Sequence, residues 1–219
     1  MHTKQIINTS RDDSSHDFSS FFSLIKDDIE SADLAIGNME FTLGGKPYSG
    51  YPSFSAPDGI EHYLGECGFD ILLLANNHIF DKGAAGAERT LERLRSLQQT
   101  HDMQFTGLAG SEEEMAQTTP LIVQRNGISL AIINCTYGTN VGCGKHWPKT
   151  NYIGEKARLK AAFDKAKEKD VDFIIALPHW GTEYELLHSE QQKITAMWLV
   201  EQGADLIIGC HPHVVQDTT

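Results

Sequence analysis

The chain has 219 residues, of which 40% are hydrophobic and 22% are charged, so its composition is that of one ordinary globular domain with a sizeable core. Asp and Glu outnumber Lys and Arg by 30 to 18, and the resulting net charge of -12 argues against nucleic acid or an anionic membrane as partner. No apolar run approaches the roughly 20 residues of a membrane span, and the polar N-terminal stretch contains no visible secretory signal.

The N-terminal part of the chain is predicted to form a loop, a helix and a strand in that order. Residues 1–17 are polar without a clear period and are expected to be a loop. Residues 18–31 carry phenylalanines and isoleucines at helical spacing, and we expect the phenylalanines to pack in the core. The strand over residues 33–36 leads into Asn38 and Glu40, whose side chains share a face if the strand continues.

A long loop over residues 44–59, rich in Gly, Pro and Ser, precedes a short helix over residues 60–67. Loops of this length in compact domains are often functional. The loop residues Tyr48, Tyr51 and Phe54 either line a substrate cleft or cover the core, and the sequence leaves both interpretations open.

Residues 69–83 (FDILLLANNHIFDKG) form the stretch that most clearly predicts a site. An apolar run bounded by polar residues is typical of a strand buried on both faces. Asn77, His78 and Asp81 follow this run. Because ligands of open α/β sheets bind at the carboxyl ends of the strands, we expect these three side chains at a functional edge.

Helices and a hairpin are predicted beyond this strand. Two apolar runs in residues 121–134 are joined by an Asn-Gly turn, which is a strong hairpin signal, so the sheets cannot all be parallel. Ser111 and the acidic run after it indicate a helix start, and residues 137–152 are expected to be a second loop beside the site. Amphipathic helices are expected over residues 86–99 and 154–169. A further helix is expected over residues 189–202, with Ser189 as its N-cap.

Two further apolar runs end in histidines. The strand over residues 172–177 leads to His179, and the strand over residues 205–208 leads to His211 and His213. We expect the segment 211–213 to be extended, so that both of its imidazoles point the same way.

Together with Glu40 and Asn77, these histidines offer imidazole, carboxylate and amide groups, which suit divalent Zn, Mn or Fe. The ligands are too many for one tetrahedral ion and about enough for two. Paired ions roughly 3.5–4 Å apart clamp a phosphoryl-type transition state.

The cysteines favour no competing chemistry. Cys67, Cys135 and Cys210 lie in or beside apolar runs and are expected to be buried thiols, whereas Cys143 lies in a Gly-rich loop. The absence of a C-x-x-C pair leaves a zinc ribbon unsupported. Cys210 lies inside the histidine cluster as an alternative nucleophile, but the metal interpretation is favoured because no nucleophile elbow accompanies it.

Four segments, in this order, are similar to the bacterial capsule-synthesis (CapA, poly-γ-glutamate) family, which itself resembles the calcineurin-like metallophosphoesterase superfamily. The segments are GNMEFTL (37–43), LANNHIFDKGAAG (74–86), PHWGTEYE (178–185) and GADLIIGCHPHVVQ (203–216). The resemblance implies a four-layer α/β/β/α sandwich of the metallophosphoesterase type. It also implies a metal-dependent phosphoesterase-like hydrolase or transferase with two divalent metal ions, acting in capsule or poly-γ-glutamate synthesis.

The resemblance also implies roles for individual residues. Asn77, His179, His211 and His213 would be metal ligands, and His78 would contact phosphoryl oxygens as general acid or charge stabiliser. Asp81 would orient His78 or cap the following helix. Asn38 stands where the superfamily usually has a metal-bridging Asp, so we expect Glu40 to supply the negative charge.

The chain also departs from the family pattern. The family begins with a strand ending in Gly-Asp, whereas this sequence starts with Met1-His2 where that strand should end, and His2 is a candidate remnant of the motif. The family also continues past the final His-x-His segment. We therefore expect residues 1–219 to be a single incomplete domain that lacks its first and last strands, with one metal site affected.

Two functions follow as hypotheses. The first is the metal-dependent hydrolase or transferase, with an anionic small molecule or polymer as substrate. The alternative is a non-catalytic polymer-binding or scaffold module on the same fold. The family resemblance suggests the bacterial cell envelope and membrane-associated capsule machinery as its setting, while the sequence sets neither the compartment nor the oligomeric state.

Overall fold

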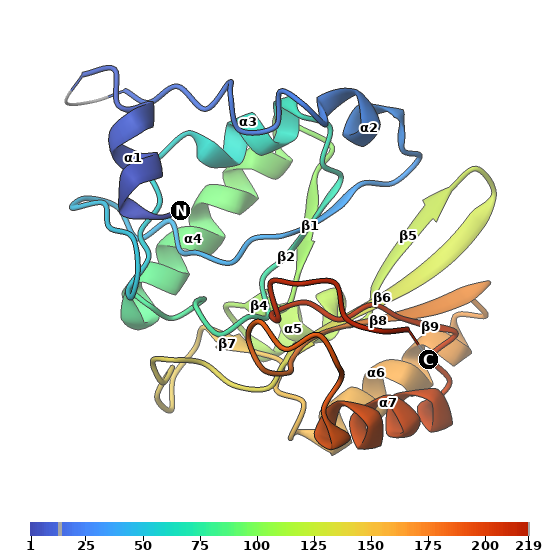
Figure 1. Cartoon of the computed structure of the whole chain (residues 1–219). Coiled ribbons are helices and arrows are strands. Elements are labelled where there is room, and N and C mark those ends of the chain that lie inside the picture. The colour runs from blue at the N-terminus through green and yellow to red at the C-terminus, as the bar shows by residue number, and fades with distance from the viewer. Residues whose placement is uncertain (13–14, 219) are drawn as a thin grey trace.

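The computed structural model describes residues 1–12 and 15–218 and contains two main sheets packed face to face, with helices outside them (Figure 1). The first sheet has the strand order β1 (Ile36–Asn38), β2 (Ile71–Leu73) and β3 (Gln104–Thr106), all parallel. Its outer face is covered by α3 (Ile60–Glu66) and α4 (Gly83–Gln98).

The second sheet is mixed and has the strand order β5, β6, β8, β9. β5 (Leu121–Arg125) and β6 (Ile128–Thr136) form the predicted antiparallel hairpin, and its Asn126-Gly127 turn takes φ values of 51° and 82°. β8 (Phe173–His179) and β9 (Leu206–Ile207) continue the sheet in parallel. The outer face is covered by α6 (Lys156–Glu168) and α7 (Glu190–Gln202).

A smaller antiparallel pair joins the two halves of the chain. It consists of β4 (Leu108–Ala109) and β7 (Lys149–Thr150). The helix α5 (Glu112–Thr118) comes directly after β4 in the chain. The Ser111 hydroxyl accepts the backbone N–H of Glu114, which is the helix start expected from the sequence.

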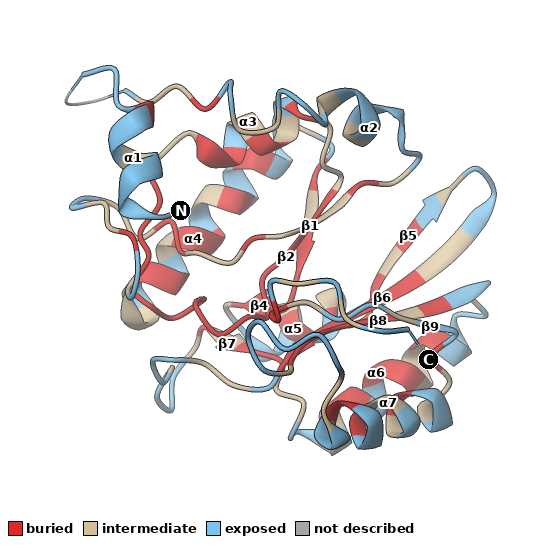
Figure 2. Cartoon of the chain, viewed as in Figure 1, coloured by how far each residue is buried: buried red, intermediate tan, exposed pale blue. Residues whose placement is uncertain are grey.

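Three apolar cores separate four layers. Leu72 of β2 packs against α4, whereas its neighbours Ile71 and Leu73 point to the other side and pack against the second sheet. In the same way, Ile133 of β6 packs against α6 while Ile132 faces the first sheet. This period-2 alternation on both sheets produces the α/β/β/α order, which confirms the four-layer prediction. Figure 2 shows the buried residues along these strands.

One buried side chain ties the two sheets together. Asn134 of β6 accepts the backbone N–H of Ala75 at 2.7 Å and donates to the carbonyl of Leu177 at 2.8 Å. A Cβ at Gly107 would lie 2.1 Å from the Asn134 Oδ1 atom, and Gly107 has a φ of 95°. The bridge therefore requires a glycine at this position.

Two N-terminal predictions are wrong. Within the expected loop 1–17, α1 (Thr3–Thr9) is helical, and the Gln5 side chain accepts the His2 backbone N–H at its start, as in a capping box. The expected helix 18–31 is reduced to α2 (Lys26–Ser31). Here aromatic packing overrides helical spacing, because the ring of Phe22 lies 5.4 Å from that of Phe69 in a turn-rich segment. Phe18 is buried, as predicted.

Among the residues described, none of the helices has both the length and the apolar character needed to cross a membrane.

Candidate functional site

Polar side chains from both sheets meet at the carboxyl ends of the strands. Glu40 follows β1 and Asn77 follows β2, while His179 is the last residue of β8 and His211 follows β9. The Asn77 side-chain oxygen lies 2.9 Å from His179 Nε2, although the two residues are 102 positions apart in the chain. The packing of the sheets thus brings together side chains from both halves, as the sequence predicted.

The inner part of the site is a group of Glu40, His179 and His211. One ligand atom from each lies within 4.8 Å of the others, and both histidines are buried. Glu40 Oε1 is 3.5 Å from His179 Nε2 and 3.9 Å from His213 Nε2. A carboxylate and two imidazoles at this spacing can share one divalent cation.

The outer part of the site is a second group, made of Glu183, His211 and His213. Its ligand atoms also lie within 4.8 Å of one another, and it shares His211 with the inner group. Glu183 and His213 are exposed, so this group faces solvent. Sequence reasoning did not single out Glu183, although it lies inside the segment 178–185 that carries the family resemblance.

Two buried ring nitrogens support a cation at this position. Within the described part of the chain, Nδ1 of His179 and Nδ1 of His211 have no hydrogen-bond partner. A buried polar atom without a partner costs about 1–3 kcal/mol, so such atoms call for an explanation. The donor set and these free nitrogens together fit a divalent cation.

Tyr137 is a site residue that sequence reasoning missed. Its ring centroid lies 4.9 Å from that of His211 and 6.4 Å from that of His179, and its hydroxyl interacts with the Asn77 side chain. Burial, together with the negative charges of Glu183 and Glu40, raises the pKa of the phenol, so it stays protonated at neutral pH. Tyr137 is the first residue of the loop 137–152, which was expected beside the site, but no pattern in the sequence distinguished this residue from its neighbours.

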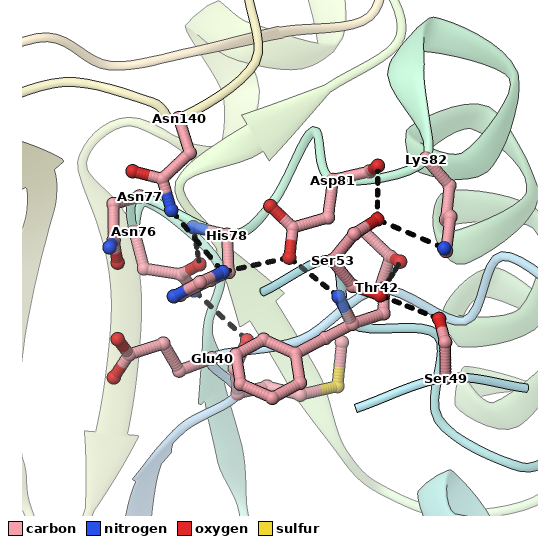
Figure 3. A network of polar contacts seen from close by, with 12 residues as sticks. Glu40, Thr42, Ser49, Ser53, Asn76, Asn77, His78, Asp81, Lys82 and Asn140 are labelled. Atoms are coloured by element: carbon pink, nitrogen blue, oxygen red, sulfur yellow. Dashed lines mark hydrogen bonds and ion pairs between the residues drawn. The ribbon is translucent and has the colours of Figure 1, made fainter. Parts of the chain in front are cut away.

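His78 lies apart from the two donor groups, in a network of hydrogen bonds with its neighbours (Figure 3). His78 Nδ1 lies 2.7 Å from Asp81 Oδ2, and the same oxygen accepts the backbone N–H of Phe54 at 2.7 Å. Asn76 accepts the His78 backbone N–H and donates to the carbonyl of Met39. Asp81 is thus placed to orient His78, which is one of the two roles expected for it.

The loop aromatics divide between the two interpretations left open. The ring of Phe54 is buried and lies 4.5 Å from that of His78. Tyr51 is exposed, and Tyr48 lines a separate cavity beside α1. Only Phe54 among the three therefore touches a predicted site residue.

The predicted geometry of residues 211–213 is wrong. His211 and His213 have φ values of 97° and 57°, so the segment is not extended. Left-handed backbone at both positions turns the chain sharply after β9. The two imidazoles are nevertheless 6.1 Å apart, inclined at 53°, and both belong to the outer group.

Asn38, His2 and Cys210 differ in their relation to the site. Asn38 Nδ2 lies 3.3 Å from Glu40 Oε2, so it contacts the site carboxylate. His2 is exposed, packs against Phe54 and lies outside both donor groups. Cys210 is half-buried rather than buried, and burial and the Glu40 charge raise the pKa of its thiol, which disfavours a nucleophilic role.

Glu40 and the histidines of the site change one another's pKa values. Burial alone would raise the pKa of Glu40, but the contact of its carboxylate with His179, at 3.5 Å, and the other nearby imidazoles hold that pKa below its usual value. Burial and the neighbouring His179 lower the pKa of His211. An ionised carboxylate beside a neutral imidazole is the protonation state that metal ligands need.

Comparison with known proteins gives a consistent result. The family model described as "Bacterial capsule synthesis protein PGA_cap" matches residues 1–219. The capsule biosynthesis protein CapA of Bacillus anthracis is 30% identical over 86% of this chain and 47% of its own length. The PGA biosynthesis protein CapA of Bacillus subtilis is 23% identical over 90% of this chain and 52% of its own length.

The chain thus spans about half the length of the curated relatives it matches. Among solved structures, the 5'-nucleotidase precursor of Thermus thermophilus is similar over 73% of this chain and 29% of its own, with a TM-score of 0.46 and 16% identity.

Proposed function

The chain belongs to the bacterial capsule synthesis protein family PGA_cap, and from that premise we propose that it is a metal-dependent phosphoesterase-like hydrolase or transferase of capsule-polymer synthesis. The observation that carries the proposal is the convergence of Glu40, His179 and His211 with partnerless ring nitrogens. The names of the relatives associate them with capsule and PGA biosynthesis, which suggests an anionic polymer or its precursor as substrate.

Six residues would hold divalent cations. Glu40 and Asn77 approach from the first sheet, and the others lie at or after the strand ends of the second sheet: His179, Glu183, His211 and His213. Cations bound there would act as Lewis acids that polarise a phosphoryl oxygen and offset the charge developing in the transition state. They would also attract an anionic substrate to a chain whose net charge is -12.

His78 is the residue proposed to move a proton. Because Asp81 accepts a hydrogen bond at Nδ1, Nε2 is the ring nitrogen left to act on a substrate. In its protonated form, His78 would donate from Nε2 to a leaving oxygen or stabilise negative charge on a phosphoryl oxygen. The Asp81 carboxylate would fix the ring orientation and stabilise the imidazolium.

The test measures metal content and turnover of a chromogenic phosphate ester on the same purified preparations. We expect Mn²⁺-dependent turnover in the wild type, and we expect His78→Ala to lower turnover by about 100-fold, the scale of general acid catalysis, with metal content unchanged. His146→Ala, an exposed histidine in the loop 137–152, is the matched control and should change neither quantity. No Mn²⁺-dependent turnover, or loss of metal in His78→Ala, would contradict these assignments.

One observation favours a second candidate, a non-catalytic polymer-binding module. Asn38 offers an amide that faces Glu40 where a carboxylate would bridge two cations better. A single tightly held cation could then bind an anionic polymer without cleaving it. Binding of poly-γ-glutamate that requires Mn²⁺, with no turnover of any phosphate ester tried, would select this candidate over the enzyme.

A further inference from the structure

The helix α7, outside the second sheet, carries apolar residues on both of its sides. Its inner side packs Leu199, Ala196 and Trp198 against the core and also buries the polar Gln192 and Thr195. Ile194, Met197 and Val200, in contrast, are 54%, 57% and 59% exposed. A helix on the surface of a globular domain normally turns its apolar stripe inward. The outward side of α7 is therefore built to be covered by something apolar.

The exposed apolar stripe repeats every three residues, so its members lie along one side of the helix. Figure 2 shows α7 at the edge of the molecule, with exposed residues along it. The opposite side of α7 packs with α6 over the second sheet. The stripe is thus directed away from the rest of the domain and is accessible to another molecule.

Two opposite charges flank the stripe at matched positions. Lys193 lies four residues before Met197, and Glu201 lies four residues after it. Both are exposed, and within the described residues neither side chain forms an ion pair. Ile194 and Val200 lie three residues before and after Met197 in the same way. The outer side of α7 is thus complementary to the same side of a second copy whose α7 runs in the opposite direction.

We propose that this side of α7 is the interface of a homodimer, in which the α7 helices of two copies pack antiparallel about a two-fold axis at Met197. Each Met197 then meets its counterpart, Ile194 packs on the partner's Val200, and Lys193 pairs with the partner's Glu201. A two-fold interface requires this kind of self-complementary patch. The chain is acidic overall, so an anionic membrane would be a poor alternative occupant.

The apolar part of the proposal is tested by sedimentation velocity over a range of protein concentrations. Because the stripe is short, we expect a monomer–dimer equilibrium with a dissociation constant on the order of micromolar, weaker than for standard-size interfaces. Met197→Asp should weaken dimerisation by about 100-fold or more, since a charge would be buried against its own copy. Leu24→Asp, on an exposed leucine that precedes α2, is the matched control and should leave the dimer intact.

The charge pattern gives a sharper test of the antiparallel arrangement. Lys193→Glu alone and Glu201→Lys alone should each weaken the dimer, by about tenfold, because each replaces two attractive pairs with two repulsive ones. The double variant carrying both substitutions should restore wild-type dimerisation. Lys4→Glu, which makes the same charge change on α1, should have no effect.

Circular dichroism melting of each variant establishes that it is folded. A wild type that stays monomeric at every concentration would overturn the proposal. A dimer that is unchanged by Met197→Asp, or one that is lost in the double charge swap as in the single variants, would overturn it as well.

Discussion

The two sheets contribute to the site in different ways. On the side of the first sheet, the polar groups after β2 bind one another: His78 contacts Asp81, and Asn76 bridges to Met39. On the side of the second sheet, His179 and His211 are also buried, but each keeps a ring nitrogen without a partner in the described structure. The polar groups after β2 thus find hydrogen-bond partners among themselves, whereas the two buried histidines of the second sheet each keep one nitrogen without a partner.

This difference separates orientation from ligand binding. A closed hydrogen-bond network holds a side chain in one rotamer and tautomer, which is what a proton-transfer residue needs. A buried imidazole nitrogen without a partner costs free energy, and a ligand that takes up its lone pair would remove that cost. Changes at His179 and His211 should therefore affect cation affinity, whereas changes in the network of His78 and Asp81 should affect stability and turnover.

The largest expected effect comes from the second side. His211→Ala removes the residue shared by both donor groups. We expect the affinity for Zn²⁺ or Mn²⁺ to fall by more than about 100-fold, beyond the ~10–100-fold that loss of an outer-shell partner costs. Equilibrium dialysis measures the affinity, and thermal unfolding without metal should stay close to that of the wild type. Loss of cooperative unfolding with metal binding unchanged would reverse the comparison.

The bridge between the two sheets should come next. Asn134→Ala leaves the N–H of Ala75 and the carbonyl of Leu177 without their side-chain partner, and both are buried. We expect the free energy of unfolding to fall by about 2–3 kcal/mol. Urea unfolding measures this loss, with Asn8→Ala, an exposed asparagine of α1, as the control. An unchanged midpoint would mean that the sheets are held together by their apolar core alone.

Asp81→Asn tests the orienting network itself. The substitution keeps the shape of the side chain but removes the charge beside His78 Nδ1 and weakens the acceptor of the Phe54 N–H. We expect a loss of about 1–2 kcal/mol of stability and a fall in turnover, while the metal content stays that of the wild type. Asp102→Asn, on an exposed aspartate, serves as the control. A metal-depleted Asp81→Asn protein would show that Asp81 is a ligand.

The smallest expected effect concerns Tyr137, which lies against the second side. Tyr137→Phe removes the hydroxyl that interacts with Asn77 but keeps the ring on His211. We expect metal affinity to fall by less than about tenfold, because a neutral polar interaction contributes no more than one neutral hydrogen bond, about 0.5–1.5 kcal/mol. Isothermal titration measures the change against Tyr51→Phe, an exposed tyrosine. A loss as large as that of His211→Ala would make Tyr137 a principal binding residue.

The same comparison shows what the sequence could reveal. The strand before Asn77, the hairpin turn at Asn126 and the helix start at Ser189 were predictable, because apolar periodicity, turn chemistry and capping are local signals. The predicted ends of these strands then placed the histidines of both sheets at the site. The short helix α1 and the turns around Phe22 were not predictable, since their contacts are made with distant segments.

The features of the site that could not be predicted depend on the path of the backbone between and after the strands. The left-handed backbone at His211 and His213 was not predictable, because only a few per cent of residues other than Gly adopt it. Glu183 and Tyr137 lie in loops, where position is set by tertiary contacts rather than by period. Site residues at the ends of strands are therefore easier to predict from sequence than site residues that lie in loops.

The most direct test of the account is the anomalous diffraction signal from crystals of this chain soaked in Zn²⁺. The account predicts a peak within about 2.2 Å of a carboxylate oxygen of Glu40 and of one ring nitrogen each from His179 and His211. Crystals that bind Zn²⁺ only elsewhere on the surface, with His179 and His211 making no bond to it, would contradict the account.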